Sequence, residues 1–233
     1  MKKIEKIPLV IFGSAEIAAL AKYYFDMDSS YEVVAFTVDD EYKNNETFCG
    51  LPLIPFSEVQ KKYPSSKYSM HVALSYTKLN QLRQEKYNQA KNAGYELATY
   101  ICSKSVTWPD LIVGDNCFIL ENQTIQPTVK IGNNVMIWSG NHLGHGSIIG
   151  DHTYIASHLV LSGNCVVGER CFFGVNATVK DFTKIGNDCF ITMDASVARD
   201  IADGSVVFGT QGKIYNENDR LAKTIKKSYF NFK

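Results

Sequence analysis

Five histidines are the side chains of this sequence best suited to acid–base chemistry, because imidazole titrates near neutral pH. A positioned imidazole takes a proton from an attacking nucleophile, and three imidazoles together can hold zinc. The five are His71, His142, His145, His152 and His158. His71 lies in an alternating apolar pattern and is expected to be structural. His152 and His158 lie one repeat unit apart in the pattern described below and are expected to stack on one corner.

Six cysteines are the second group with possible chemistry, either as a disulfide framework or as metal ligands. They are Cys49, Cys102, Cys117, Cys165, Cys171 and Cys189. No C-x-x-C pair occurs. The longest early apolar run, residues 7–12, contains Pro8 and is far too short for a signal-peptide core or a membrane span. Disulfide and metal interpretations are therefore both disfavoured.

Composition and charge limit the class of protein. The 233 residues allow one large domain or two small ones, and 45% apolar residues indicate a packed core. The 24 basic residues balance 24 acidic ones, whereas a protein that holds phosphate backbones needs a basic excess. We therefore expect a soluble cytoplasmic protein that binds no nucleic acid and has no membrane span.

A six-residue repeat runs through the second half of the chain. Every sixth residue from Val113 to Val197 is apolar, and most of these residues are β-branched. Glycine follows the apolar residue at every third step, at Gly114, Gly132, Gly150, Gly168 and Gly186, and a polar pair follows each glycine. Three hexapeptides therefore make one coil, and Gly and Asn at a corner tolerate the positive φ of a tight turn. The pattern predicts a triangular parallel β-solenoid whose apolar side chains stack along the axis.

Four of the cysteines find a place in this solenoid. Each lies two residues before an axial apolar position, in a slot that Ser147, Ala177 and Ala195 also occupy. This slot takes small side chains inside the corner. Cys117, Cys165, Cys171 and Cys189 are therefore expected to be small core residues, and Cys49 and Cys102 have no assigned role.

The first hundred residues alternate apolar runs with segments of helical composition. Strands are expected at residues 7–12, 32–37, 68–73 and 96–101, and helices at residues 15–24, 56–63 and 77–93. This order predicts a small parallel α/β domain of the nucleotide-binding kind.

Two segments of this domain are candidates for binding a nucleotide. Gly13 and Ser14 follow the first strand, where such folds set a phosphate against a helix N-terminus. A full Gly-x-Gly-x-x-Gly is absent and Glu16 would repel a phosphate, so an ordinary turn is the alternative. Asp39 and Asp40 follow the second strand and are candidates for contacting a ribose or base edge; an acidic pair in a surface turn is the alternative.

A small Rossmann-like domain followed by hexapeptide coils resembles bacterial sugar acetyltransferases of the bacillosamine, perosamine and sialic-acid pathways. The resemblance covers essentially the whole chain. It is carried by Ile11-Phe12-Gly13-Ser14, the Asp39-Asp40 pair, the coils and the segment at residues 141–151. The fold implied is an α/β domain plus a β-solenoid: a Rossmann-like sugar-nucleotide-binding domain at residues 1–100 and a left-handed parallel β-helix at residues 101–212. A basic tail at residues 213–233, with Leu221, Ile225 and Tyr229 as an apolar stripe, is expected to be helical.

The resemblance also implies a homotrimer with active sites between adjacent prisms, acetyl-CoA as acyl donor and a nucleotide-activated amino sugar as acceptor. The histidine matching His145 is the family's catalytic base, which deprotonates the sugar amine as it attacks the thioester directly. A main-chain N–H matching Gly163 meets the thioester oxygen. The Gly13-Ser14 turn lies near the diphosphate, and the Asp39-Asp40 pair contacts the nucleotide base.

Three further residues are candidates for this site. His142 is a candidate second catalytic residue. Gly209 and Lys213 belong to a stretch resembling the loop that holds the coenzyme A end, although the usual proline and alanine are missing.

This sequence departs from the family at two places. The acid that often follows the base is replaced by Gly146, and Glu16 stands where a histidine is usual. Another residue must then orient His145, and diphosphate binding is in doubt.

The function these features favour is N-acetylation of a nucleotide-linked 4-amino-4,6-dideoxyhexose for polysaccharide biosynthesis. O-acetylation of a sialic-acid-like sugar or surface glycan, and an inactive trimeric sugar-binding scaffold, are the alternatives. The histidine spacing is a poor match to the zinc pattern of carbonic anhydrases of similar shape, so no metal is expected.

Overall fold

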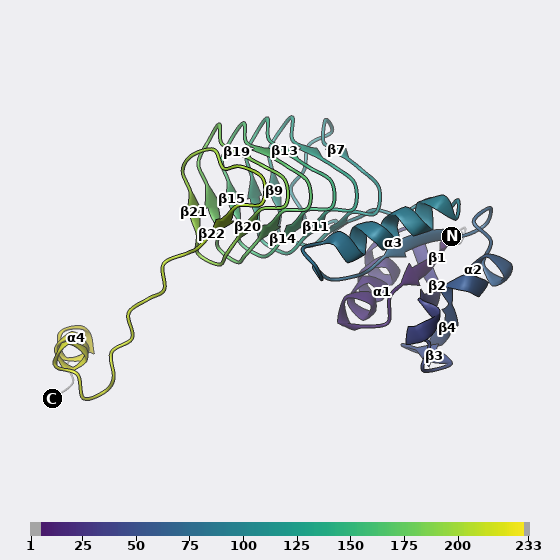
Figure 1. The fold of residues 1–233 in the computed structure, drawn as a ribbon, viewed down its shortest axis with the longest axis horizontal. Helices are drawn as coiled ribbons and strands as arrows, with labels where there is room; N and C mark the ends of the chain where they lie inside the picture. Colours follow the sequence, from purple (N-terminus) through teal and green to yellow (C-terminus); the bar gives the residue numbers. More distant parts are fainter. Residues whose placement is uncertain (1–5, 231–233) are drawn as a thin grey trace, which may run out of the picture.

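Alternating apolar strands and helices form an α/β domain at one end of a long β-solenoid (Figure 1). The computed structural model describes residues 6–230. The domain consists of β1 (Ile7–Phe12), α1 (Glu16–Asp28), β2 (Tyr31–Val38), the short 3-10 helix η1 (Asp40–Tyr42), β3 (Thr47–Phe48), β4 (Leu51–Pro55), α2 (Phe56–Lys62), β5 (Ser69–Val72) and α3 (Gln81–Asn92). The strand order is β3-β4-β2-β1-β5, and only β3 is antiparallel to its neighbour. The predicted small parallel α/β domain is therefore confirmed.

Two expectations for this domain were wrong in detail. The helix expected from residue 77 begins at Gln81, because Lys78, Leu79 and Asn80 have φ of 50 to 65°, which ends helical geometry. The strand expected at residues 96–101 is divided: Leu97 forms only an isolated parallel bridge with Met70 of β5, and the strand β6 (Tyr100–Ile101) pairs with the solenoid. The hairpin of β3 and β4 was not anticipated.

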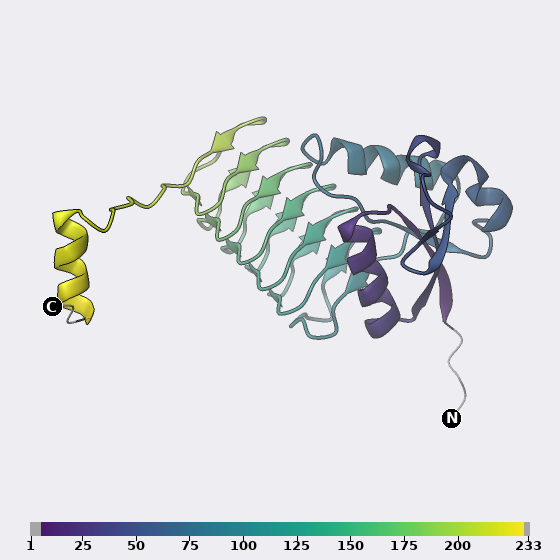
Figure 2. The same ribbon diagram turned by 90° about the horizontal axis from the view of Figure 1, so that it is seen from below.

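The predicted solenoid is confirmed, with three parallel sheets of two-residue strands (Figure 2). The docked face, which carries the α/β domain, consists of β6, β8 (Phe118–Ile119), β11 (Met136–Ile137), β14 (Tyr154–Ile155), β17 (Phe172–Phe173), β20 (Phe190–Ile191) and β22 (Val206–Val207). The His142 face consists of β9 (Thr124–Ile125), β12 (His142–Leu143), β15 (Val160–Leu161), β18 (Thr178–Val179) and β21 (Ser196–Val197). The third face consists of β7 (Ile112–Val113), β10 (Lys130–Ile131), β13 (Ile148–Ile149), β16 (Val166–Val167) and β19 (Lys184–Ile185).

The axial residues and the corner cysteines form the solenoid core. The four repeat cysteines are buried, and each thiol lies near a main-chain carbonyl of the next coil, as between Cys117 Sγ and Gly132 O at 3.0 Å. Burial raises the pKa of the Cys117 thiol to about 12, which removes thiolate reactivity at neutral pH. The prediction of small core residues is confirmed. Cys102 is also buried, and Cys49 is exposed.

The repeated glycines serve a different purpose from the one expected. None of the five has positive φ; that conformation falls on the second residue of each polar pair, from Asn116 (53°) to Asp188 (55°). A Cβ on each glycine would instead collide with the next coil, as at Gly150, where it would lie 2.5 Å from Gly168. Glycine is required here for close approach between coils.

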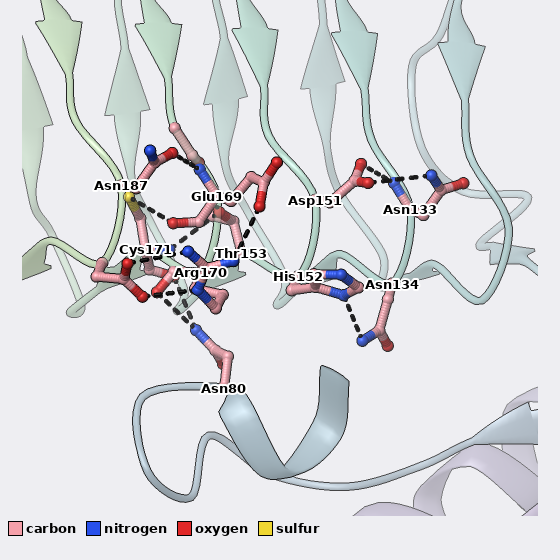
Figure 3. Close-up of polar contacts among 12 residues, drawn as sticks. Asn80, Asn133, Asn134, Asp151, His152, Thr153, Glu169, Arg170, Cys171 and Asn187 are labelled. Atoms are coloured by element: carbon pink, nitrogen blue, oxygen red, sulfur yellow. Dashed lines mark hydrogen bonds and ion pairs between the residues drawn. The ribbon is translucent and has the colours of Figure 1, made fainter. Parts of the chain in front are cut away.

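The α/β domain docks against the solenoid through two contacts of different character. Aromatic packing joins α1 to the docked face, with the rings of Phe25 and Phe118 stacked at 6.2 Å. Polar groups at the start of α3 contact the corner between the third and docked faces (Figure 3). There Asn80 Nδ2 donates to the carbonyls of Arg170 (3.3 Å) and Cys171 (3.0 Å). The buried guanidinium of Arg83 donates to the carbonyls of Asn134 and His152.

His71 and His152 are buried structural histidines. His71 Nδ1 pairs with the carbonyl of Ala98 at 2.9 Å, which confirms its expected role. His152 stacks one coil above Asn134, and its Nδ1 lies 2.9 Å from the Asn134 amide (Figure 3). It shares no corner with His158, so that expectation was wrong: residues six apart lie on successive corners, and only residues eighteen apart stack. Burial lowers the pKa of both His71 and His152 to about 4.

This burial predicts a pH-dependent stability. In the unfolded chain each of the two imidazoles binds a proton near pH 6.5, but in the folded protein only near pH 4. The unfolded state therefore binds more protons between these values, so stability is full above pH 6.5 and falls toward pH 4, by up to roughly 3 kcal/mol per histidine.

Urea unfolding at pH 7, 5.5 and 4.5 measures this loss. His152→Asn is the matched variant, because asparagine already fills the same corner position at Asn116 and Asn134. Its stability should fall less steeply with pH than that of the wild type. Equal slopes in the two proteins would contradict the assignment.

Beyond the last coil an extended segment leads to α4 (Arg220–Phe230), which stands away from the solenoid (Figure 1). The expected helix in the tail is confirmed, and none of its residues is buried. Residues 231–233 of the predicted tail lie outside the described residues. Within residues 6–230, no helix is long and apolar enough to cross a membrane.

Candidate active site

His145 lies in the turn between β12 and β13, at the corner where the His142 face meets the third face. We call this turn, with its equivalents in the coils on either side, the His145 corner. His145 is exposed, and both its main chain and its ring contact one oxygen of Gln126 in the preceding coil. Gln126 Oε1 lies 2.8 Å from the main-chain N of His145 and 3.0 Å from its Nδ1.

Gly163, one coil further on, lies against the imidazole of His145. A Cβ on Gly163 would lie 2.7 Å from Cε1 and 2.9 Å from Nε2 of the ring, so only glycine leaves the ring in place. Among the described residues, no acceptor is found for the N–H of Gly163. The imidazole of His145 and the main-chain N–H of Gly163 therefore lie close together at one corner. This arrangement suits a general base next to a donor that stabilises a developing oxyanion.

His142 lies on the same edge of the molecule, on β12, three residues before His145. It is in register with Thr124 and Val160 of the neighbouring coils and is half-buried on the outward side of its face. The structure thus brings His142, His145 and Gly163 into one region of the solenoid. Within residues 6–230, no three His, Cys, Asp or Glu side chains gather as a metal site requires.

An aromatic groove of about 500 Å³ lies at the edge of the docked face. Tyr154 and Phe172 are stacked with ring centroids 5.3 Å apart, and Tyr76 packs edge-on against both, at 5.1 and 4.8 Å. Further residues line the groove, among them Trp138, Ser157, Phe190 and Met193. This groove was not predicted from the sequence. Its signal was an aromatic ring every eighteen residues, at Phe118, Tyr154, Phe172 and Phe190, with Met136 in the remaining place.

The Gly13-Ser14 turn is connected to this groove through the loop after β5. Gly13 has φ of 131°, and a Cβ there would lie 2.8 Å from the carbonyl oxygen of Ala73. Tyr76, three residues after Ala73, reaches the groove. Glu16 is exposed in the first turn of α1, where its carboxylate meets the positive end of the helix dipole.

Asp39 and Asp40 both have protein partners. Asp40 accepts from the main-chain N–H (3.2 Å) and the hydroxyl (2.6 Å) of Ser57, which holds its pKa below the usual value. Asp39 Oδ1 accepts from Lys86 Nζ at 2.9 Å. Both carboxylate oxygens of Asp40 therefore accept hydrogen bonds from Ser57 at the start of α2, whereas only one oxygen of Asp39 accepts a hydrogen bond, from Lys86.

Gly209 and Lys213 lie beyond the last coil and away from the His145 corner. The N–H of Gly209 donates to Thr192 Oγ1 at 2.8 Å, and the glycine packs against Met193 at the rim of the aromatic groove. Lys213 is exposed on the extended segment that leads to α4. In the structure neither residue is brought to His145.

Comparison with known proteins supports the architecture. Residues 128–163 match the bacterial transferase hexapeptide family (six repeats). No curated protein matches the chain. The solved acetyltransferase domain of PglB from Neisseria gonorrhoeae FA1090, in complex with acetyl coenzyme A, is 20% identical and aligns over 86% of this chain and 95% of its own, with a TM-score of 0.76.

Two further structures are similar over most of their length. PerB from Caulobacter crescentus, in complex with CoA and GDP-perosamine, is 23% identical over 87% of this chain and 97% of its own, with a TM-score of 0.76. WeeI from Acinetobacter baumannii AYE is 18% identical and aligns over 86% of this chain and 96% of its own, with a TM-score of 0.73. These likenesses confirm the predicted fold class, a Rossmann-like α/β domain followed by a left-handed parallel β-helix.

Proposed function

We propose that this protein is an acetyl-CoA-dependent sugar acetyltransferase that N-acetylates a nucleotide-linked 4-amino-4,6-dideoxyhexose. The observation that carries the proposal is the His145 corner, where an imidazole lies against Gly163 beside a main-chain N–H that has no acceptor among the described residues. The structural neighbours with acetyl coenzyme A or CoA and GDP-perosamine bound supply the choice of donor and acceptor.

In the proposed reaction His145 takes a proton from the sugar amine as the nitrogen attacks the thioester carbonyl. A C–N bond forms, and the carbonyl oxygen gains negative charge that the Gly163 N–H stabilises. The tetrahedral intermediate then collapses, the C–S bond breaks, and CoA leaves as the thiolate, which recovers the proton from the imidazolium. His142 lines the same approach, and Gly209 and Lys213 would contact the far end of CoA.

The aromatic groove suits the acceptor sugar. Exposed aromatic rings such as Tyr76 and Phe190 bind the C–H faces of a hexose, and a 6-deoxy sugar adds an apolar methyl group. The nucleotide would extend along the loop of Tyr76 to the Gly13-Ser14 turn. Asp39, with its free oxygen, and the neighbouring Asp40 would then face the base.

A homotrimer is part of the proposal. Isolated apolar side chains are exposed around the His145 corner, including Val160 (44%), Ile148 (42%) and Phe182 (69%). Phe182 lies in the coil directly after Gly163, to whose carbonyl its N–H donates. Packing of a second copy on these residues would cover the corner and bring its own aromatic groove toward His145.

O-acetylation is a second candidate, favoured by Glu16. An exposed carboxylate in the first turn of α1 opposes a diphosphate at that helix end. A free sialic-acid-like sugar or a glycan carries no diphosphate there.

Calorimetric titration of the full chain with acetyl-CoA, and then with UDP-, dTDP-, GDP- and CMP-linked sugars, tests the proposal. We expect micromolar binding of acetyl-CoA, one preferred amino-sugar nucleotide, and a trimer mass by light scattering. Acetyl-CoA binding without any nucleotide partner would favour O-acetylation. A protein that binds no acetyl-CoA would be a scaffold, and the transferase proposal would be wrong.

A further inference from the structure

We infer that Gln126 is the positioning residue of this site: its side-chain oxygen holds His145 as the Nδ1–H tautomer and leaves Nε2 free to accept a proton. The catalytic meaning of this inference rests on the proposed function. The tautomer itself is a property of the folded protein.

The hydrogen bonds around Gln126 fix which atom donates. Its oxygen accepts from the main-chain N–H of His145 at 2.8 Å, a group that can only donate. This identifies the amide oxygen, because a flipped amide would set two N–H groups against each other. The same oxygen lies 3.0 Å from Nδ1. Nδ1 must therefore carry the proton, and in neutral imidazole Nε2 then holds the free lone pair.

The coil that carries His145 also holds Gln126 in this place. The main-chain N–H of Gln126 donates to the carbonyl of Leu143 at 2.9 Å, as part of the ladder between β9 and β12. Two residues on, Thr128 Oγ1 accepts from the N–H of Gly146 at 3.0 Å. Gln126 is half-buried, so its position is set by the same inter-coil contacts that position the His145 turn.

Gly146 explains why the orienting group comes from another coil. It has φ of 68°, and a Cβ at this position would run into the side-chain amide of Asn164 one coil above. A side chain directly after His145 has no room with Asn164 in place. The orienting contact is therefore supplied from the coil below, nineteen residues earlier in the chain.

The choice of an amide has a chemical consequence. A carboxylate beside Nδ1 would stabilise the imidazolium, whereas a neutral amide fixes the tautomer without adding charge. Gln126→Glu should therefore keep the tautomer and favour the protonated imidazolium of His145. Gln126→Met has a similar shape and no acceptor, so it should release the tautomer.

The test is nitrogen NMR of the full-length protein with labelled histidine, with the His145 signals assigned by their loss in His145→Asn. We expect the Nδ1–H tautomer in the wild type and in Gln126→Glu, and a mixture with Nε2–H in Gln126→Met. In acetyl transfer, Gln126→Met should lower kcat by about 10- to 100-fold. Gln126→Glu should move the acidic limb of the kcat/KM profile to higher pH. Gln89→Met, an exposed glutamine on α3, is the matched control and should change neither readout.

The tautomer readout separates this inference from the proposed function. An Nε2–H tautomer in the wild type, or an Nδ1–H tautomer that persists in Gln126→Met, would overturn the inference even if the enzyme is active. The wild type could transfer no acetyl group while Gln126→Met still loses the Nδ1–H tautomer. That result would refute the proposed function and support the positioning role of Gln126.

Discussion

Replacement of His145 by alanine should lower kcat/KM for acetyl transfer by about 10²-fold or more. General-base catalysis contributes a factor of this size, and His145 is the group proposed to take the amine proton at the thioester. Loss of the imidazole also removes the ring that lies against Gly163. Acetyl-CoA consumption with the preferred sugar acceptor, followed under initial-rate conditions, measures the effect.

The fold should be unaffected, because His145 is exposed and sits on a turn held by main-chain bonds. Thermal unfolding of His145→Ala should therefore match the wild type. His158→Ala is the matched control: this second exposed histidine also packs its ring on a glycine, Gly140, but at a different corner. Its activity should stay within about threefold of wild type. Comparable losses in both variants would show that His145 is not the base.

Replacement of Arg83 by alanine should destabilise the protein by about 3 kcal/mol. Its buried guanidinium donates to the carbonyls of Asn134 and His152 and, at 3.0 Å, to Asn80 Oδ1. Alanine leaves these acceptors buried without donors, and each such loss costs about 1 kcal/mol or more. Burial lowers the pKa of Arg83 to about 10, so the group is still charged at pH 7 and keeps the N–H donors that make these bonds.

Urea unfolding at fixed protein concentration, followed by tryptophan fluorescence, measures this loss. Trp138 packs against the cluster between α1 and the docked face, so it reports on domain docking. Arg83→Lys keeps the charge but lacks the planar fork, and should recover only part of the stability. Arg199→Ala removes an exposed arginine and should change stability by less than about 0.5 kcal/mol. If Arg83→Ala behaves like Arg199→Ala, the contact does not stabilise docking.

The sequence by itself determined the solenoid, its axial core and the burial of four cysteines. Each coil repeats the same local pattern, so every axial residue contacts its equivalent eighteen positions away, and a periodic sequence encodes a periodic structure. The strand-turn-helix of β1, Gly13 and α1 was predictable for a similar reason, because apolar runs and helical spacing are local signals.

Only the tertiary structure decided which groups meet. It assigned His152 to a stack with Asn134, placed Gln126 against His145, and brought Tyr76 from the α/β domain onto Tyr154 and Phe172. The corner glycines were recognised from the repeat, but the reason for them, close approach of the next coil, needed the stacked coils themselves. Periodicity specifies which residues face inward, whereas the partner of an outward side chain depends on the offset between coils and on how a second domain docks across them.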